Sequence, residues 1–322
     1  MTRDYRIDTI KGLLIILVIM GHIIIELDNA NIINHGVMGL IYIFHMPLFI
    51  LISGYLTKHP SQQEPLQMWK GVGNILVTLV IFHLLSACCT YLRYGIFLEP
   101  LKMFPFGALW YLLSLACWRI MLYYSPKRLL GRPLLYLGMG FVISLLSGLT
   151  NLLSSCPSLQ RTLNFYFFFL LGFYYRQGDF NTPLWHNNKL HAGIAVVTLP
   201  LLLWLFPRCG NVMNGADYYG LDGMPEKAMV LICSIAVTLL VFNLTRDNRW
   251  LRHIGKDSLF YYVYHILVLA LIVTPLVKYF QWPSSFPFIA LYTALAVLIL
   301  LLMSKIKLFW WVMHPTFKKK EK

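Results

Sequence analysis

The chain has few charged residues. Asp, Glu, Lys and Arg make up 12% of its 322 residues, whereas about a quarter of a soluble globular domain is charged. Hydrophobic residues make up 58%, and the mean hydropathy is +0.64. The apolar runs are long enough to cross a bilayer as helices and do not alternate as the strands of a membrane barrel would. These features predict an all-α, polytopic integral membrane protein.

The apolar runs predict about ten transmembrane helices in a single membrane domain that covers residues 1–322. If the N-terminus is cytoplasmic, 21 of the 27 Lys and Arg residues fall in cytoplasmic segments, and the positive-inside rule then predicts that both termini are cytoplasmic. The formal net charge of +14 is therefore a topology signal, and no nucleic-acid partner is expected. No small-residue cleavage site follows the first run, so we expect it to be retained. The predicted spans are 10–27, 36–57, 71–91, 107–123, 133–150, 162–176, 190–206, 227–245, 257–278 and 285–304.

Carboxylates are missing from the interior of every predicted span. All thirteen Asp and Glu residues lie near span ends or in loops. Ion-coupled transporters usually bury carboxylates as relays in the membrane, so their absence disfavours that class. A transporter or flippase of a glycan or lipid-linked intermediate stays as the alternative function. Histidine is then the only expected base inside the membrane.

Cysteine is also sparse. The six cysteines form no CxxC pair and no Cys/His cluster with zinc-binding spacing, so no metal site is expected. Cys156 and Cys209 lie in two predicted outer loops. A disulfide between them is possible in an oxidising compartment, and the sequence leaves it open.

The first predicted span contains both a lysine and a histidine. His22 follows Lys11 by eleven positions, which on a helix is about three turns, so both side chains lie on one face roughly 16 Å apart. Lys11 is predicted at the cytoplasmic edge, where Asp8 could pair with it. The alternative is that Lys11 only anchors the topology. His83 lies in a span without supporting context, and we interpret it as a packing residue.

His45 lies in a second span that contains helix-perturbing residues. Pro47 follows it and is predicted to kink the helix, and Ser53 and Gly54 add small groups farther along. Such helices line a cavity or make a close packing contact. Tyr55, Trp110, Tyr111 and His265 are further candidates for lining a site. Basic residues that could hold an anionic ligand are Lys58, Arg249, Arg252 and Lys256.

Five stretches together resemble the acyltransferase-three family of integral membrane acyltransferases, especially its fucose O-acetylase-like members. They are DTIKGLLIILVIMGH, FHMPLFILISGY, ALWYLLSL, FYFFFLLGFYYR and GKDSLFYYVYH. The resemblance covers nearly the whole chain. Lys11 occupies the position at which the family usually has arginine, and lysine keeps the charge but lacks the planar fork that binds phosphate in a bidentate manner.

The resemblance implies a membrane O-acetyltransferase of a bacterial inner membrane. Its donor would be cytoplasmic acetyl-CoA, a substrate and not a bound cofactor, and its acceptor a hydroxyl of a cell-envelope glycan or related molecule. Contact with membrane lipids is expected, and a homo-oligomer stays open.

We hypothesise that His22 is the general base and that His45 orients the acceptor or stabilises the oxyanion. An acyl-histidine intermediate stays open. The donor would be held by Lys11, Lys58, Arg249, Arg252 and Lys256, and the acceptor site lined by Tyr55, Trp110, Tyr111 and His265.

Overall fold

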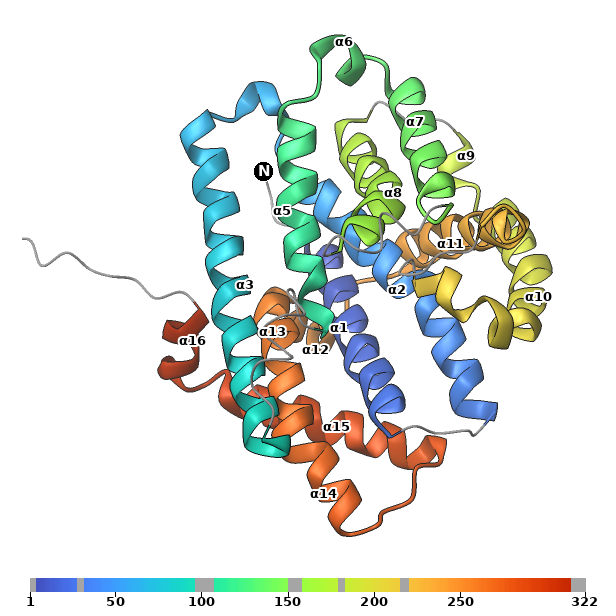
Figure 1. Ribbon diagram of the computed structural model, residues 1–322. Coiled ribbons are helices and arrows are strands. Elements are labelled where there is room, and N and C mark those ends of the chain that lie inside the picture. The colour runs from blue at the N-terminus through green and yellow to red at the C-terminus, as the bar shows by residue number, and fades with distance from the viewer. Residues whose placement is uncertain are drawn as a thin grey trace, which may run out of the picture.

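The protein is a bundle of helices (Figure 1). The computed structural model describes residues 4–27, 32–95, 107–149, 158–178, 183–214 and 220–313, and within these ranges all regular structure is helical. The predicted all-α class is therefore confirmed there. The longer helices are α1 (Tyr5–Glu26), α2 (Ile32–Leu56), α3 (Pro65–Tyr94), α5 (Trp110–Tyr123), α7 (Pro133–Leu146), α8 (Leu159–Gln177), α10 (Asn188–Asn214), α11 (Met224–Leu244), α13 (Ser258–Val268) and α15 (Phe286–Met303).

Short helices connect or extend these elements. The short turn η2 (Gly107–Leu109) leads into α5, and η4 (Leu269–Val273), a π-helical turn, continues α13 into α14 (Thr274–Tyr279). In Figure 1, α6 joins α5 to α7 at the top of the view. The remaining short elements are η1 (Pro60–Gln62), α6 (Lys127–Leu130), α9 (Pro183–His186), α12 (Arg249–Lys256) and α16 (Lys307–Met313).

Within the described residues, six helical segments are long and apolar enough to cross a membrane. Two further predicted spans correspond to the shorter apolar helices Gly107–Tyr123 and Pro133–Leu146. The last two, 162–176 and 190–206, fall within α8 and α10. A helical membrane protein is therefore supported, whereas ten crossings and cytoplasmic termini stay predictions. The six segments are Tyr5–Glu26, Gly36–Leu56, Pro65–Tyr94, Met224–Leu244, Ser258–Tyr279 and Phe286–Met303.

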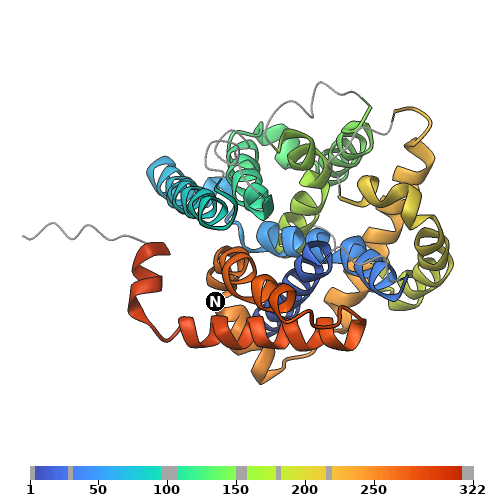
Figure 2. The same ribbon diagram turned by 60° about the horizontal axis from the view of Figure 1, so that its bottom comes forward.

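Helix α1 lies at the centre of the bundle. Both views show it surrounded by other helices, with α15 along the lower edge of Figure 2. The side chain of Asp4 accepts a hydrogen bond from the Arg6 backbone amide at 2.9 Å, which satisfies one of the free amides at the start of the helix. Helix α1 packs against α2, α12, α13 and α15. A central apolar helix of this kind is buried around most of its circumference.

Two pairs of helices cross at glycines. A Cβ atom on Gly12 would overlap the Leu251 carbonyl of α12, and one on Gly255 would overlap the Asp8 carbonyl of α1. Small residues at membrane helix interfaces permit this close backbone approach. Gly12 and Gly255 therefore make a packing contact between α1 and α12.

The second crossing joins α2 to α8. A Cβ atom on Gly54 would overlap the Phe169 carbonyl, and one on Gly172 would overlap the Leu51 carbonyl. Helix α2 also continues through Pro47 as a single helix from Ile32 to Leu56. The crossing therefore fixes α2 and α8 against each other, and both helices contribute side chains to the site described next.

Five helices line one cavity, and we call the end of the bundle that holds it the Lys11 end. The lining comes from the first half of α1, the second half of α2, the first half of α3, the start of α13 and α5 from Tyr111 to Arg119. The last turns of α1 carry His22, and the middle of α2 carries His45. The disulfide that the sequence leaves open concerns residue 156 and the side chain of residue 209, which lie outside what the structure describes.

Candidate active site

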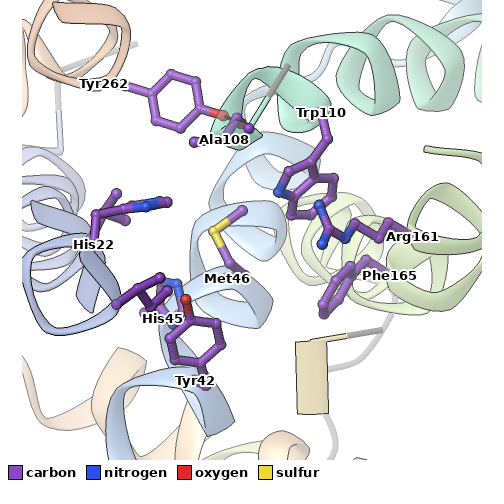
Figure 3. A pocket seen from close by; sticks show the side chains of 12 residues that line it. His22, Tyr42, His45, Met46, Ala108, Trp110, Arg161, Phe165 and Tyr262 are labelled. Atoms are coloured by element: carbon purple, nitrogen blue, oxygen red, sulfur yellow. Dashed lines mark hydrogen bonds between the residues drawn. The ribbon is translucent and has the colours of Figure 1, made fainter. Parts of the chain in front are cut away.

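His22 and His45 line the same cavity. It has a volume of about 250 Å³ and is formed by residues of α1, α2, η2, α5, α8 and α13. We call it the histidine cavity. Figure 3 shows the two imidazoles beside each other at its wall, with Trp110 and Arg161 across from them. The structure therefore brings together the two histidines that the sequence singled out.

The backbone restricts the protonation of His45. Its Nδ1 lies 2.6 Å from the Ile41 carbonyl oxygen. A carbonyl oxygen only accepts hydrogen bonds, so Nδ1 must donate, and in the neutral ring Nε2 is left as an acceptor. His45 is buried, and its ring contacts the edge of Tyr42 at a centroid distance of 5.0 Å. A neutral His45 is therefore suited to accept a hydrogen bond from a hydroxyl.

His22 lies between two cavities. Besides the histidine cavity, it lines a second one of about 150 Å³ that His265 also lines. The centroids of the two imidazole rings are 5.1 Å apart. His265 does not line the histidine cavity, so the structure places it behind His22 and not with the other predicted acceptor residues.

Arg161 brings a positive charge to the histidine cavity. Its Cζ lies 5.2 Å from the centroid of the Trp110 ring, within the range of a cation–π contact. Trp110 in turn stacks on Phe165 at 5.5 Å. The sequence analysis did not choose Arg161, because a single arginine at the end of a span is also typical of the membrane interface. The aromatic residues that follow Arg161 in the sequence were the signal that could have identified it as part of a site.

Lys11 lines a different cavity at the Lys11 end, which we call the Lys11 cavity. Its volume is about 260 Å³, and most of its wall is apolar. The Lys11 Nζ lies 2.8 Å from Asp8 Oδ1, which confirms the predicted pairing. Tyr111 lies in this wall, and its hydroxyl is 2.6 Å from Ser53 Oγ. Tyr111 therefore faces the Lys11 cavity, whereas its neighbour Trp110 faces the histidine cavity.

Arg119 is a functional candidate that the sequence analysis missed. It lines the Lys11 cavity and also an adjoining cavity that contains Lys58. Its Nε is buried without a hydrogen bond, and no ion pair involves it within the described ranges. We counted it only as a cytoplasmic charge. An arginine inside a predicted apolar span was the signal that could have identified it.

Three other predicted donor residues lie elsewhere. Arg249, Arg252 and Lys256 line a wide cavity of about 790 Å³ together with Tyr5 and Asp8. Arg252 Nη1 is 2.8 Å from Asp247 Oδ2. The structure thus divides the predicted donor residues into two groups. Lys11 and Lys58 line adjoining cavities, and the three residues of α12 line a different one.

Tyr262 forms the boundary between the histidine cavity and the Lys11 cavity. It lines both, and its hydroxyl donates a hydrogen bond to the Ala108 carbonyl. Its ring contacts Tyr111 at a centroid distance of 5.3 Å. The two cavities therefore adjoin at one aromatic side chain.

Tyr55 contributes to packing at the end of α2. Its carbonyl accepts a hydrogen bond from Arg176 Nη1 at 3.0 Å, and its ring lies 6.1 Å from that of Phe242. It lines neither the histidine cavity nor the Lys11 cavity. Of the four predicted acceptor residues, Trp110 is the one that the structure places with His22 and His45.

The comparison with known sequences is consistent with this arrangement. Residues 4–305 match the profile of a family described as "Acyltransferase domain". The chain belongs to this acyltransferase family. The match covers nearly the whole chain, and it includes the six helical segments that are long and apolar enough to cross a membrane.

Two relatives carry the same name. The chain is 31% identical to nodulation protein NolL of Sinorhizobium fredii (strain NBRC 101917 / NGR234) over 228 residues, which are 63% of this chain and 58% of that protein. It is 36% identical to nodulation protein NolL of Mesorhizobium japonicum (strain LMG 29417 / CECT 9101 / MAFF 303099) over 87 residues, 24% of this chain and 21% of the relative. The alignments thus span about half of the first relative and a fifth of the second. No solved structure matches the chain.

Proposed function

We propose that this acyltransferase transfers an acetyl group from cytoplasmic acetyl-CoA to a hydroxyl of a cell-envelope glycan or related acceptor, in a bacterial inner membrane. One observation carries the proposal: a cavity with two cationic side chains, Lys11 and Arg119, adjoins a cavity with two histidines at Tyr262. Acetyl-CoA has an anionic nucleotide at one end and a thioester at the other, so it needs cationic side chains for the nucleotide and, farther along, a base beside the thioester. The family membership favours this enzyme over a transporter or flippase.

The donor would enter at the Lys11 end, which the proposal places in the cytoplasm. Arg119 and Lys58 lie where the nucleotide phosphates would bind. Arg119 is half-buried, and its buried Nε has no hydrogen-bond partner among the described residues, so an anionic ligand would supply one. The apolar wall of the Lys11 cavity suits the pantetheine arm, which would run past Lys11 to Tyr262. The separate group of Arg249, Arg252 and Lys256 would attract the anionic donor to this side of the membrane.

The acceptor would bind in the histidine cavity. The rings of Trp110 and Tyr42 offer aromatic faces of the kind that pack against sugars, and the neutral His45 can orient a hydroxyl through its Nε2. This favours the orienting role of His45 over the oxyanion role, because a neutral ring whose Nδ1 is already engaged has no further N–H to donate. Arg161 supplies a positive charge that can stabilise the oxyanion.

Transfer of the acetyl group to the acceptor hydroxyl requires one general base. A neutral His22 accepts the proton of the acceptor hydroxyl as its oxygen attacks the thioester carbonyl carbon. The tetrahedral intermediate collapses, the carbon–sulfur bond breaks, and the leaving CoA thiolate takes the proton from His22. The products are the acetyl ester and CoA thiol, and His22 returns to its neutral form. Direct transfer requires no covalent enzyme intermediate.

The test is acetyl transfer by the purified protein in lipid nanodiscs. Radiolabelled acetyl-CoA is offered with a panel of glycans, and label in the acceptor is counted. We expect transfer by the wild type and by His83→Gln, a matched variant of a buried histidine that lines neither cavity. His22→Gln should lose transfer and keep CoA binding, measured by calorimetry. Normal transfer by His22→Gln would refute the base role, and absence of CoA binding to the wild type would refute the acetyltransferase function.

A further inference from the structure

His265 carries a buried nitrogen without a hydrogen-bond partner. The side chain is fully buried, and its Nδ1 lies 2.5 Å from the Tyr262 carbonyl oxygen. Because that oxygen can only accept, Nδ1 carries the hydrogen, and in the neutral ring Nε2 has a free lone pair. Among the residues that the structure describes, none makes a hydrogen bond to Nε2. A buried acceptor left in this state costs about 1–3 kcal/mol, so a partner is expected.

The candidate partner is His22, whose ring contacts that of His265. The ring centroids are 5.1 Å apart with an interplanar angle of 50°. Both rings also line the 150 Å³ cavity between α1, α3 and α13, which can hold a bridging water because it is roomy and has polar groups in its wall. Within the described part of the chain no other hydrogen bond to His22 is found. An N–H of His22 can therefore reach His265 Nε2 through one water in this cavity, or directly after a small movement of the two rings.

We propose that His265 is a positioning residue for His22: its Nε2 accepts the hydrogen from one His22 ring nitrogen, so that the other ring nitrogen presents its lone pair to the histidine cavity. This proposal rests on the proposed base role of His22. In serine proteases a buried carboxylate holds the catalytic imidazole in the required tautomer. Here the Tyr262 carbonyl orients His265, and His265 orients His22.

The surroundings favour a neutral pair. The charged and titratable side chains that face the shared cavity are Glu26 of α1 and Cys89, Arg93 and Tyr94 of α3. Glu26 and Arg93 are 3.7 Å apart and neutralise each other. Neither imidazole forms an ion pair with a carboxylate within the described ranges, and a charged imidazole buried without one is costly. A second imidazole can act as an acceptor here without adding charge to the site.

A spectroscopic test separates this proposal from the proposed reaction. Protein labelled with nitrogen-15 histidine is studied by NMR in nanodiscs, and the His22 signals are identified as those lost in His22→Gln. In the wild type we expect one His22 nitrogen to be protonated and one to be unprotonated. In His265→Phe the two signals should move toward an average, because the tautomer is no longer fixed. In His265→Gln they should stay apart, because the amide oxygen can replace Nε2. His22 signals that are the same in all three proteins would overturn the proposal, whether or not the protein transfers acetyl groups.

The kinetic test uses the same variants and the transfer assay described above. We expect His265→Phe to lower kcat by about 10- to 100-fold, the range seen for groups that orient metal-bound histidines, with KM for acetyl-CoA unchanged. His265→Gln should recover most of the loss, and His83→Phe is the matched control for removal of a buried histidine. An unchanged kcat in His265→Phe would overturn the positioning role, and so would an equal loss in the Phe and Gln variants. A change in KM alone would also overturn it.

Discussion

The crossing of α2 and α8 predicts a large effect from one added methyl group. An ideal Cβ on Gly54 would lie 2.8 Å from the Phe169 carbonyl carbon and 3.0 Å from the Phe173 amide nitrogen, whereas ordinary contacts are 3.4 Å or longer. It would also overlap the Phe169 carbonyl oxygen. These are backbone atoms and cannot rotate away, so the two helices must separate. Overpacking of this kind costs about 1–3 kcal/mol, and we expect Gly54→Ala to destabilise the protein by at least that much.

The effect should extend to the site. Helix α2 carries His45, and α8 carries Arg161, so separation of the two helices changes the shape of the histidine cavity. The measurement is thermal unfolding in detergent, followed by circular dichroism, and we expect the midpoint to fall on the order of 5 °C. Gly138→Ala on α7 is the matched control, because a Cβ there meets nothing within 4 Å. If Gly54→Ala is as stable as the wild type, or if Gly138→Ala loses as much, the close-packing argument is wrong.

Three further predictions concern the two adjoining cavities. Arg119→Gln should raise KM for acetyl-CoA by about ten- to a hundredfold, because a hydrogen bond to a charged group contributes about 1.5–3 kcal/mol. Arg128→Gln, at an exposed position, is the control. An unchanged KM in Arg119→Gln contradicts a role in phosphate binding. Tyr262→Ala should open the boundary between the cavities, so that water hydrolyses acetyl-CoA without an acceptor. Release of CoA thiol should exceed that of the wild type and of Tyr262→Phe, and equal release in all three contradicts a barrier. Arg161→Gln should lower kcat by about 10²-fold, because the guanidinium that stabilises the oxyanion is lost. Arg161→Lys should recover part of this loss, because it keeps the charge. A change in KM for the acceptor alone would show that Arg161 binds the acceptor instead.

The sequence predicted those parts of the fold that depend on local spacing. Helix α1 extends over the first apolar run, and the Lys11–Asp8 pair forms as expected because residues three apart lie on one side of a helix. His22 follows Lys11 by about three turns on this helix, as the spacing predicts, so the two side chains line different cavities along its length. Depth along a membrane helix follows from the rise per residue, which requires no knowledge of neighbouring helices.

The rotation of each helix about its own axis, which decides the cavity that each side chain faces, could not be predicted in this way. Trp110 and Tyr111 are adjacent in the chain, yet they face different cavities. His265 lies behind His22 and not with Trp110, and Arg249 lines a different cavity from Lys11. Rotation about the helix axis is set by packing against neighbours. An apolar helix that is buried on most of its faces gives little periodic signal from which to infer it.

By itself, the sequence determined the helical class of the protein, the positions of its apolar segments and the spacing of polar side chains along one helix, because these follow from apolar length and helical rise. The glycine crossings, the boundary at Tyr262, the cavity position of Arg119 and the ring contact between His22 and His265 were decided only by the tertiary structure. Each of these depends on which side chains face each other across different helices, and that is determined by side-chain packing among segments far apart in the chain.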